Sequence, residues 1–239
     1  MKTKKSKKKL NKLITEFELT QAYENIRANI MFSIVKSGCK KIIVTSSYES
    51  EGKSTVASNI AKQLSKLNVK VLLIDMDFRH PTQSCLFNFS HEDGLSDLII
   101  SGKSLSSTVK SIEDYPNLHV ITTGTSVPSP SNLLASKKLE KLLSYFEEQY
   151  EYVIIDTPPI NIISDALYVA KYTDGVILVV KEGSTTHPML KKAMSSLELI
   201  NIPILGFILN ASKKSSSDSH YSGYHSYYYN NYEKGWFIC

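Results

Sequence analysis

Residues 46–55, SSYESEGKST, end in a glycine, a lysine and two hydroxyl residues, a combination that suits phosphate binding. In loops of the pattern GxxxxGK[ST], backbone N–H groups wrap a phosphate, the lysine reaches the β- and γ-phosphates, and the Ser or Thr binds Mg²⁺. Gly52, Lys53 and Ser54 fit this pattern, but Ser47 stands at the position of its first glycine. The strict pattern therefore fails, and GKS alone is weak support for a nucleotide site.

Aspartates close two apolar runs further along the chain. LLIDMD (72–77) contains Asp75 and Asp77, which are two positions apart in an extended segment and so point to the same side. One could hold Mg²⁺ while the other faces a reacting hydroxyl; alternatively, either could be a helix cap or a loop carboxylate. YVIID (152–156) ends in Asp156, the Walker B arrangement, in which a carboxylate holds Mg²⁺ directly or through water. Three strand ends that each carry part of one nucleotide–metal site outweigh the missing glycine.

The surrounding elements determine whether these side chains can meet. Short apolar runs predict strands at 40–46, 69–75, 117–122, 152–156, 175–181 and 204–210. Helical spacing of apolar residues predicts helices at 18–35, 54–67, 136–150 and 187–200. Nearly continuous apolar strands that alternate with helices indicate an α/β fold, a parallel sheet covered by helices on both faces. Such sheets bind ligands at the carboxyl ends of their strands.

Composition divides the chain of 239 residues into three parts. Residues 1–16 form a basic arm that we expect to be flexible, because the first twelve residues hold seven lysines and no acid. The arm could lie on anionic lipid or be a solvated end, and nothing in it favours nucleic acid. Residues 17–210 form the nucleotide-binding domain, and residues 211–239, with seven serines and six tyrosines, a flexible tail. No apolar run is long enough to span a membrane and no signal peptide opens the chain, so we expect a cytoplasmic protein.

The combination of IDMDFR after a GKST loop with IIDTPP resembles the bacterial tyrosine kinases (BY-kinases) of capsule and exopolysaccharide gene clusters. The resemblance covers roughly residues 17 to 232 and continues in NIRANIMFS (25–33), RHPTQ (79–83), GLSDLI (94–99), PSPSNLL (128–134), SDA (164–166) and GFILN (206–210). It is closest in kind to the stand-alone cytoplasmic form of Gram-positive bacteria, whose transmembrane activator is a separate polypeptide. It implies a P-loop NTPase-like fold with a Walker A motif in the phosphate loop, a second Walker motif, A′, at Asp75 and Asp77, and a Walker B motif that ends in Asp156.

The resemblance also implies a role for each candidate residue. Lys53 and the loop residues around it would bind the ATP phosphates: Ser50, Glu51, Gly52, Ser54 and Thr55. Ser54, Asp75 and Asp156 would hold Mg²⁺, and Asn210 would face adenine. Lys53, Asp75 and Asp77 would form the catalytic set, with Asp77 orienting or deprotonating the tyrosine hydroxyl. That help is needed because a phenol has a pKa near ~10 and is a poor nucleophile at neutral pH.

The implied function is an ATP-dependent tyrosine autokinase that phosphorylates its own tail and so regulates polysaccharide polymerisation and export. The acceptors would be Tyr221, Tyr224, Tyr227, Tyr228, Tyr229 and Tyr232. The implied partners are a transmembrane protein of the polysaccharide-chain-length/activator type, further copies of the chain in a homo-oligomer, and a cognate tyrosine phosphatase. The activator would bring the protein to the inner face of the cell membrane.

Two departures from the family keep alternatives open. Glu49 and Ser50 stand where members usually carry Pro-Gly, so that ATP affinity could be lower, and a Glu49 carboxylate would repel ATP unless it points outward. Gln21, Glu24 and Arg27 stand at the ExxRxxR positions of the N-terminal helix, which puts the family's ring interface in doubt. The alternatives are a positioning or switch ATPase, which usually has a lysine at the position of Tyr48, and a non-catalytic partner whose tail another kinase phosphorylates.

Overall fold

The structure, a computed structural model, describes residues 2–90 and 93–211. Seven strands form one sheet in the order β3-β4-β2-β5-β1-β6-β7. Their bounds are β1 Lys40–Ser46, β2 Val71–Asp75, β3 Lys110–Ile112, β4 Tyr115–Ile121, β5 Tyr152–Asp156, β6 Gly175–Lys181 and β7 Ile204–Asn210. All neighbouring pairs are parallel except β3–β4, which is antiparallel. The expected parallel sheet is confirmed, with one short antiparallel strand added at its edge.

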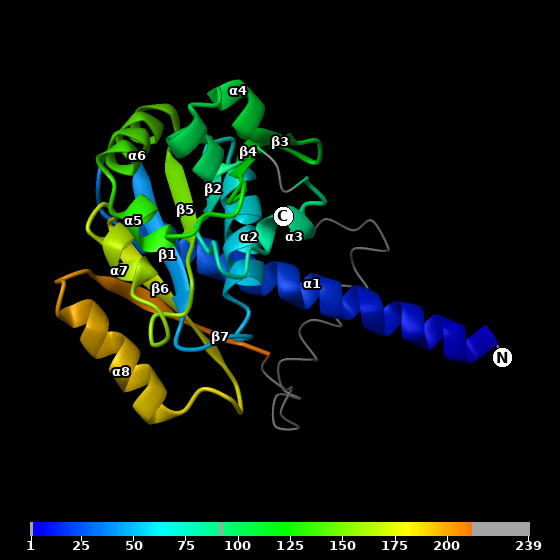
Figure 1. The fold of residues 1–239 in the computed structure, drawn as a ribbon. Coiled ribbons are helices and arrows are strands. Elements are labelled where there is room, and N and C mark those ends of the chain that lie inside the picture. Colours follow the sequence, from blue (N-terminus) through cyan, green and yellow to red (C-terminus); the bar gives the residue numbers. More distant parts are fainter. Residues whose placement is uncertain (1, 91–92, 212–239) are drawn as a thin grey trace.

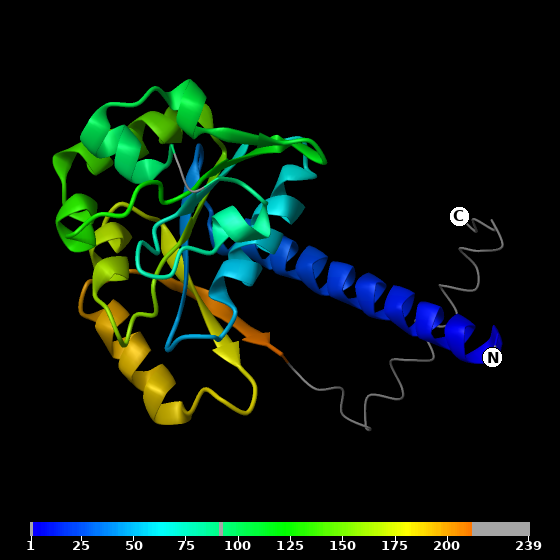
Figure 2. The same ribbon diagram turned by 45° about the vertical axis from the view of Figure 1, so that its right-hand side comes forward.

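Helices cover both faces of the sheet, as Figures 1 and 2 show. On one face, α1 (Lys2–Ser33) and α2 (Lys53–Ser65) pack their apolar side chains against β1, β2, β4 and β5. The opposite face is covered by α5 (Pro130–Leu134), α6 (Lys137–Gln149), α7 (Asp165–Ala170) and α8 (His187–Glu198). Three short elements complete the fold: α3 (Gln83–Leu86), the π-helix η1 (Asp97–Ser101) and α4 (Leu105–Thr108).

Helix α1 begins earlier than the apolar spacing predicts. We expect a start at residue 18, whereas the helix begins at Lys2 and runs without a break to Ser33. The segment has neither glycine nor proline, and lysine and leucine are good helix formers, so nothing local ends the helix. Its N-terminal part extends away from the sheet (Figure 2). The helix thus runs through the segment expected to be a flexible arm, and a domain boundary at residue 17 stays a prediction.

The strand register brings the candidate aspartates to one edge of the sheet. Asp75 at the end of β2 pairs with Asp156 at the end of β5, and Asp156 in turn pairs with Val44 of β1. Strand β1 continues from there into the loop that leads to α2. The carboxyl ends of β1, β2 and β5 therefore meet, as the sequence predicts. Within the described part of the chain, no helix is both long and apolar enough to cross a lipid bilayer.

Candidate active site

The loop between β1 and α2 has the backbone form of a phosphate-binding loop. Gly52 immediately precedes α2 with φ of 91°, a left-handed conformation that costs glycine little. Its carbonyl accepts the hydrogen bond from the Val56 amide that starts the helix. The first N–H groups of a helix have no partner within it and carry the positive end of its dipole. The amides of Lys53, Ser54 and Thr55 are therefore placed where an anion would be bound.

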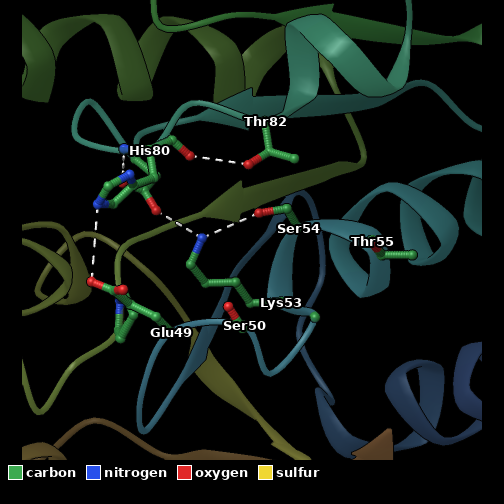
Figure 3. A pocket seen from close by; sticks show the side chains of 10 residues that line it. Glu49, Ser50, Lys53, Ser54, Thr55, His80 and Thr82 are labelled. Atoms are coloured by element: carbon green, nitrogen blue, oxygen red, sulfur yellow. Dashed lines mark hydrogen bonds and ion pairs between the residues drawn. The ribbon is translucent and has the colours of Figure 1, made fainter. Parts of the chain in front are cut away.

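A pocket of about 330 Å³ opens in front of these amides. Its lining comes from the loop and the start of α2, from the segment after β2, and from one residue after β5: Glu49, Ser50, Gly52, Lys53, Ser54, Thr55, Asp77, His80, Thr82 and Pro159. Figure 3 shows the Lys53 side chain extending across it, with Glu49 and His80 on one side and Ser54 on the other. Six of these residues are predicted from the sequence as site residues, whereas no role is predicted for His80, Thr82 or Pro159.

Lys53 lies among acidic groups. Its Nζ is 2.7 Å from Oδ2 of Asp77, 3.7 Å from Oδ1 of Asp156, and donates a hydrogen bond of 3.1 Å to the Ser54 hydroxyl. Burial by itself lowers the pKa of Lys53, but the attraction of Asp156 and Asp77 outweighs it and raises the pKa above its ordinary value. Lys53 is thus held as a cation at the point where the three strand ends meet.

Asp77 is fixed in orientation by its own loop. Its Oδ1 accepts hydrogen bonds from the backbone N–H groups of Arg79 (3.3 Å) and His80 (3.0 Å), which leaves Oδ2 directed at Lys53. The side chain is 1% exposed, yet it contributes to the pocket lining. A carboxylate oxygen so aimed can accept a proton or a hydrogen bond from a hydroxyl that enters the pocket.

Asp75 organises the segment that carries Asp77. It is fully buried and accepts three backbone hydrogen bonds of 3.0 Å, from the N–H groups of Asp77, Thr82 and Gln83. Burial, together with the nearby charge of Asp156, raises the pKa of Asp75 to about 8. Both of its oxygens are engaged in these contacts, which agree with the alternative reading of Asp75 as a loop carboxylate; its metal-binding role stays a prediction.

Gln83 connects the Walker A segment with the Walker B strand. It lies within RHPTQ, and no role is predicted for it from the sequence. Its side chain is buried, and Nε2 donates to Oδ2 of Asp156 (2.9 Å) and to the Ser54 carbonyl (3.0 Å). This amide sets the separation of Ser54 and Asp156. Only the tertiary structure reveals this, because Gln83 is remote from both in the sequence.

Ser54 and Asp156 fit a magnesium ion. Oδ1 of Asp156 is buried without a hydrogen-bond partner among the described residues, and burial raises the pKa of this carboxyl. Such an atom, in the same cluster as the Ser54 hydroxyl, suits a hard cation that prefers oxygen ligands. Over residues 2–90 and 93–211 no cluster of three or more His, Cys, Asp or Glu side chains could hold a metal. Mg²⁺ does not require one, because it is usually bound through one or two carboxylates together with substrate phosphates and water.

The two residues that depart from the family pattern have distinct geometries. Ser50 has φ of 60°, in the left-handed region that favours glycine, and its carbonyl accepts a hydrogen bond of 3.1 Å from Nζ of Lys181. Glu49 lies at the pocket rim with 57% of its side chain exposed, and its Oε1 is 3.9 Å from Nε2 of His80 (Figure 3). The Glu49 carboxylate therefore lies at the edge of the pocket, beside His80.

Glu51 and Asn210 support the loop from behind. The Glu51 side chain is buried, with its carboxylate accepting hydrogen bonds from the Tyr48 amide and the Thr185 hydroxyl. Nδ2 of Asn210 donates to the Glu51 carbonyl at 2.9 Å and lies directly over Gly52, where a Cβ atom would come within 2.1 Å of it. Contacts of both residues with ATP, through the Glu51 backbone and the Asn210 side chain, stay predictions.

The ExxRxxR positions of α1 make contacts within the same chain. Nε2 of Gln21 donates to Oε2 of Glu24 at 2.8 Å, and Nη1 of Arg27 donates to the Gln63 carbonyl of α2 at 3.4 Å. The helix packs on its own sheet, as its apolar spacing allows. The predicted phosphoacceptors, Tyr221 to Tyr232, lie outside the described residues.

Comparison with known proteins agrees with this geometry. Residues 39–200 match the family described as AAA domain. The chain is 36% identical to the tyrosine-protein kinase YwqD of Bacillus subtilis (strain 168) over 205 residues, and the matched region covers 86% of each protein. Among solved structures, the kinase domain of the Escherichia coli tyrosine kinase ETK has a TM-score of 0.76 and 30% identity, over 82% of this chain and 79% of that one.

A more distant structure shares the fold alone. The septum site-determining protein MinD of Pyrococcus horikoshii OT3, in complex with Mg-ADP, has a TM-score of 0.62 at 22% identity, covering 74% of this chain and 72% of that chain. A P-loop NTPase-like sheet, a phosphate-binding loop and two aspartate-tipped strands define a nucleotide-binding phosphotransferase or NTPase domain. The close relatives decide between these classes: the chain belongs to the bacterial tyrosine-protein kinases.

Proposed function

We propose that this tyrosine kinase transfers the γ-phosphoryl group of ATP to the tyrosines of its own C-terminal tail. The observation that carries the proposal is the position of Lys53, whose ammonium lies between Asp77 of the A′ segment and Asp156 of the Walker B strand inside the phosphate-loop pocket. A cation there can meet the β- and γ-phosphates, while Asp77 can meet an entering hydroxyl.

The chain's own groups would bind and orient ATP. The first amides of α2 receive phosphate oxygens, and Lys53 exchanges Asp77 for the terminal phosphates. Ser54 and Asp156, with Asp75 behind them, would hold Mg²⁺, which neutralises charge on the phosphates when it is bound. The MinD protein, which shares this fold, was solved with Mg-ADP bound, and this supports a magnesium nucleotide as the ligand of the present site.

Release of Lys53 would free Oδ2 of Asp77 for the acceptor. The phenol oxygen forms a bond to the γ-phosphorus while the bond from that phosphorus to the β–γ bridging oxygen breaks, so that ADP leaves. The phenol proton passes to Oδ2 of Asp77, whose orientation is maintained by the amides of Arg79 and His80. This proton acceptor is needed because the ordinary pKa of tyrosine is near ~10.

The proposed acceptor segment is the C-terminal tail. It follows β7, whose last residue, Asn210, lies against Gly52 of the phosphate loop, so the tail begins beside the pocket. The acceptors would be the six tyrosines from 221 to 232, presented to the pocket of a neighbouring copy. Each phosphate adds about −1.5 to −2 charges at pH 7, and several together would repel neighbouring copies and end the association.

Partners follow from the same cycle. We expect a homo-oligomer, a transmembrane activator of the polysaccharide-chain-length type that brings the kinase to the inner face of the membrane, and a cognate tyrosine phosphatase that resets the tail. The biological output would be regulated polymerisation and export of a capsular or extracellular polysaccharide. Gln21 and Glu24 do not follow the ExxRxxR pattern and bond to each other within α1, so we expect copies of this chain to associate through other contacts.

The test is incubation of the full chain with γ-labelled ATP and Mg²⁺, with and without the cytoplasmic end of the activator. Label on tail tyrosines is expected, and it should be lost in Lys53→Met but kept in Lys66→Met, an exposed lysine of the C-cap of α2. Free phosphate without labelled protein would instead support a switch ATPase. Label that survives Lys53→Met would contradict the proposal, and neither product with activator present would indicate a non-catalytic partner. Tyr→Phe at all six tail positions then shows whether the tail is the main acceptor.

A further inference from the structure

An apolar groove separates α1 from the edge strand β7, on the face of the sheet away from α8. Its volume is about 370 Å³, and it is lined by Ile26, Asn29, Ile30, Phe32, Ser33, Ile177, Leu205, Gly206, Phe207 and Ile208. At its rim Phe32 is 82% exposed, and Phe207 of β7 is 50% exposed, so that the groove is part of a contiguous exposed apolar patch. The groove plays no part in the nucleotide site.

Gly206 leaves the floor of the groove open. A Cβ atom built on this glycine would meet nothing within 4 Å, and its backbone is not in the left-handed region. Glycine is therefore not required here by backbone conformation, and the space above it is free for an inserted side chain. Asn29 and Ser33 add side-chain oxygens at the rim, which could accept a hydrogen bond from an inserted polar group such as an indole N–H.

We propose that the last residues of this chain, Trp236, Phe237 and Ile238, dock in this groove. In the sequence, residues 212–239 come one residue after the end of β7, the strand that forms one wall of the groove. Apart from tyrosines, their apolar residues are confined to the final WFIC. The groove is apolar with polar atoms at its rim, and the segment offers two large apolar side chains with an indole that can use those atoms.

The length of the intervening chain allows this docking within one molecule. Gly206 precedes Ala211, the last described residue, by only five positions, or about 17 Å of extended strand. The chain from Ala211 to Trp236 can extend up to ~80 Å, so it can return to the groove with ample slack. Attachment to the same molecule also gives the segment an effective concentration of order millimolar, which a separate partner must match.

Trp236 is the one tryptophan of the chain, so its fluorescence reports the docking directly. In the full chain its emission is expected at shorter wavelength, and its quenching by acrylamide to be slower, than in the urea-unfolded chain. Gly206→Leu, which fills the floor, and Phe32→Glu, which makes the rim charged, should each return both properties to unfolded-like values. Leu199→Glu, at an 85% exposed position beyond the end of α8, is the matched control and should change neither. Circular dichroism should show that all three variants stay folded.

Three results would overturn the proposal. An unfolded-like emission in the unchanged chain would show that the segment is not docked. A protected emission that survives both groove variants would place the segment elsewhere. Protection that is lost on dilution would show that the groove takes the tail of a second copy instead.

Discussion

Nζ of Lys53 and Oδ2 of Asp77 lie 2.7 Å apart, with side chains that are 11% and 1% exposed. The pair crosses the pocket from the phosphate loop to the segment after β2, so each residue neutralises the other where substrates must enter. In the proposed reaction the two have different partners: phosphate for Lys53 and a tyrosine hydroxyl for Asp77. Binding of ATP therefore has to separate a buried ion pair, and the contact of Lys53 with phosphate must compensate for the lost attraction of Asp77.

Asp77→Asn should separate nucleotide binding from phosphoryl transfer. The change removes the anion that competes for Lys53, so we expect ATP to bind at least as tightly as before. Transfer to tyrosine should fall by about 10²–10⁴-fold, the range for loss of a general base. Calorimetry with Mg²⁺–ATP and labelling of the tail measure the two effects, with Asp114→Asn, at an exposed loop position, as the control. Equal losses of binding and transfer would show that Asp77 acts through the nucleotide.

Ser50→Gly should stabilise the phosphate loop. A residue with a Cβ atom in the left-handed region destabilises the folded chain by about 1–2 kcal/mol. Glycine removes this strain, but its greater freedom in the unfolded chain offsets part of the gain. With Ser50 at φ of 60°, we expect the free energy of unfolding to rise by up to about 1 kcal/mol and ATP affinity to rise with it. Chemical denaturation and calorimetry measure these. Ser50→Ala keeps the Cβ atom and should give no gain; an equal gain from alanine would mean that the hydroxyl, not the backbone, is unfavourable.

Glu49→Gln should tighten ATP binding, and more so at low salt. The carboxylate stands at the pocket rim beside His80 and adds negative charge near the phosphate site. Because it is exposed, its effect should be no more than about 1 kcal/mol, or roughly fivefold in affinity, and should shrink as salt screens it. Titrations at two ionic strengths test this, with Glu198→Gln, an exposed acid at the end of α8, as control. A loss of affinity would show instead that Glu49 contributes to ATP binding, either through the metal or by positioning His80.

Asp75 should make the protein less stable as pH rises, in buffers without divalent metal. Burial and the Asp156 charge raise its folded pKa from 3.8 to about 8, so between these values the folded chain keeps a proton that the unfolded chain loses. The free energy of unfolding therefore decreases from about pH 4 to about pH 8 and levels off above that. Denaturation in the presence of EDTA at a series of pH values measures the slope.

The Asp75→Asn variant identifies the source of that slope. Loss of acceptor capacity for three backbone amides should lower stability by about 1–3 kcal/mol, but the decrease between pH 4 and pH 8 should become shallower. Asp114→Asn, in a solvated loop, should keep the slope of the unchanged chain. A slope that is identical in all three proteins would assign it to groups other than Asp75.

The strands that position the site are predicted well from the sequence, because the apolar runs that mark them are local. Strands β1, β5 and β6 occur with the predicted bounds, since a buried parallel strand needs an apolar run and little else. The partly exposed edge strand β7 also has the predicted bounds, because its run ILGFIL is apolar throughout. The antiparallel strand β3 escapes prediction because its three residues, KSI, carry no periodicity and pair only through the neighbouring β4. Helix α1 is predicted too short because apolar spacing marks only the part of a helix that packs.

Side-chain partners are harder to predict than strand ends. Lys53, Asp77 and Asp156 each lie at or after the end of a predicted strand, which places them at one edge of the sheet. The structure confirms that the three side chains meet there. Gln83 lies in the RHPTQ segment and Lys181 at the end of a predicted strand, and neither has a predicted role. Their contacts with Asp156 and with the Ser50 carbonyl depend on elements far apart in the chain. Glu51 is of a type that is rarely buried, so its inward position could not be expected from residue type.

Asn210 and Gly52 should show energetic coupling, because the Asn210 amide occupies the space that a side chain at position 52 would need. Asn210→Ala removes the hydrogen bond to the Glu51 carbonyl, so we expect a loss of about 1 kcal/mol of stability and weaker ATP binding from a looser loop. Gly52→Ala should be worse, because its Cβ would lie 2.1 Å from Asn210 Nδ2 and its backbone is left-handed. In the double variant the collision is absent, so the combined loss of stability should be smaller than the sum of the two single losses. Denaturation of the four proteins measures this coupling, and strictly additive losses would mean that only the backbone strain at Gly52, and not its contact with Asn210, requires glycine there.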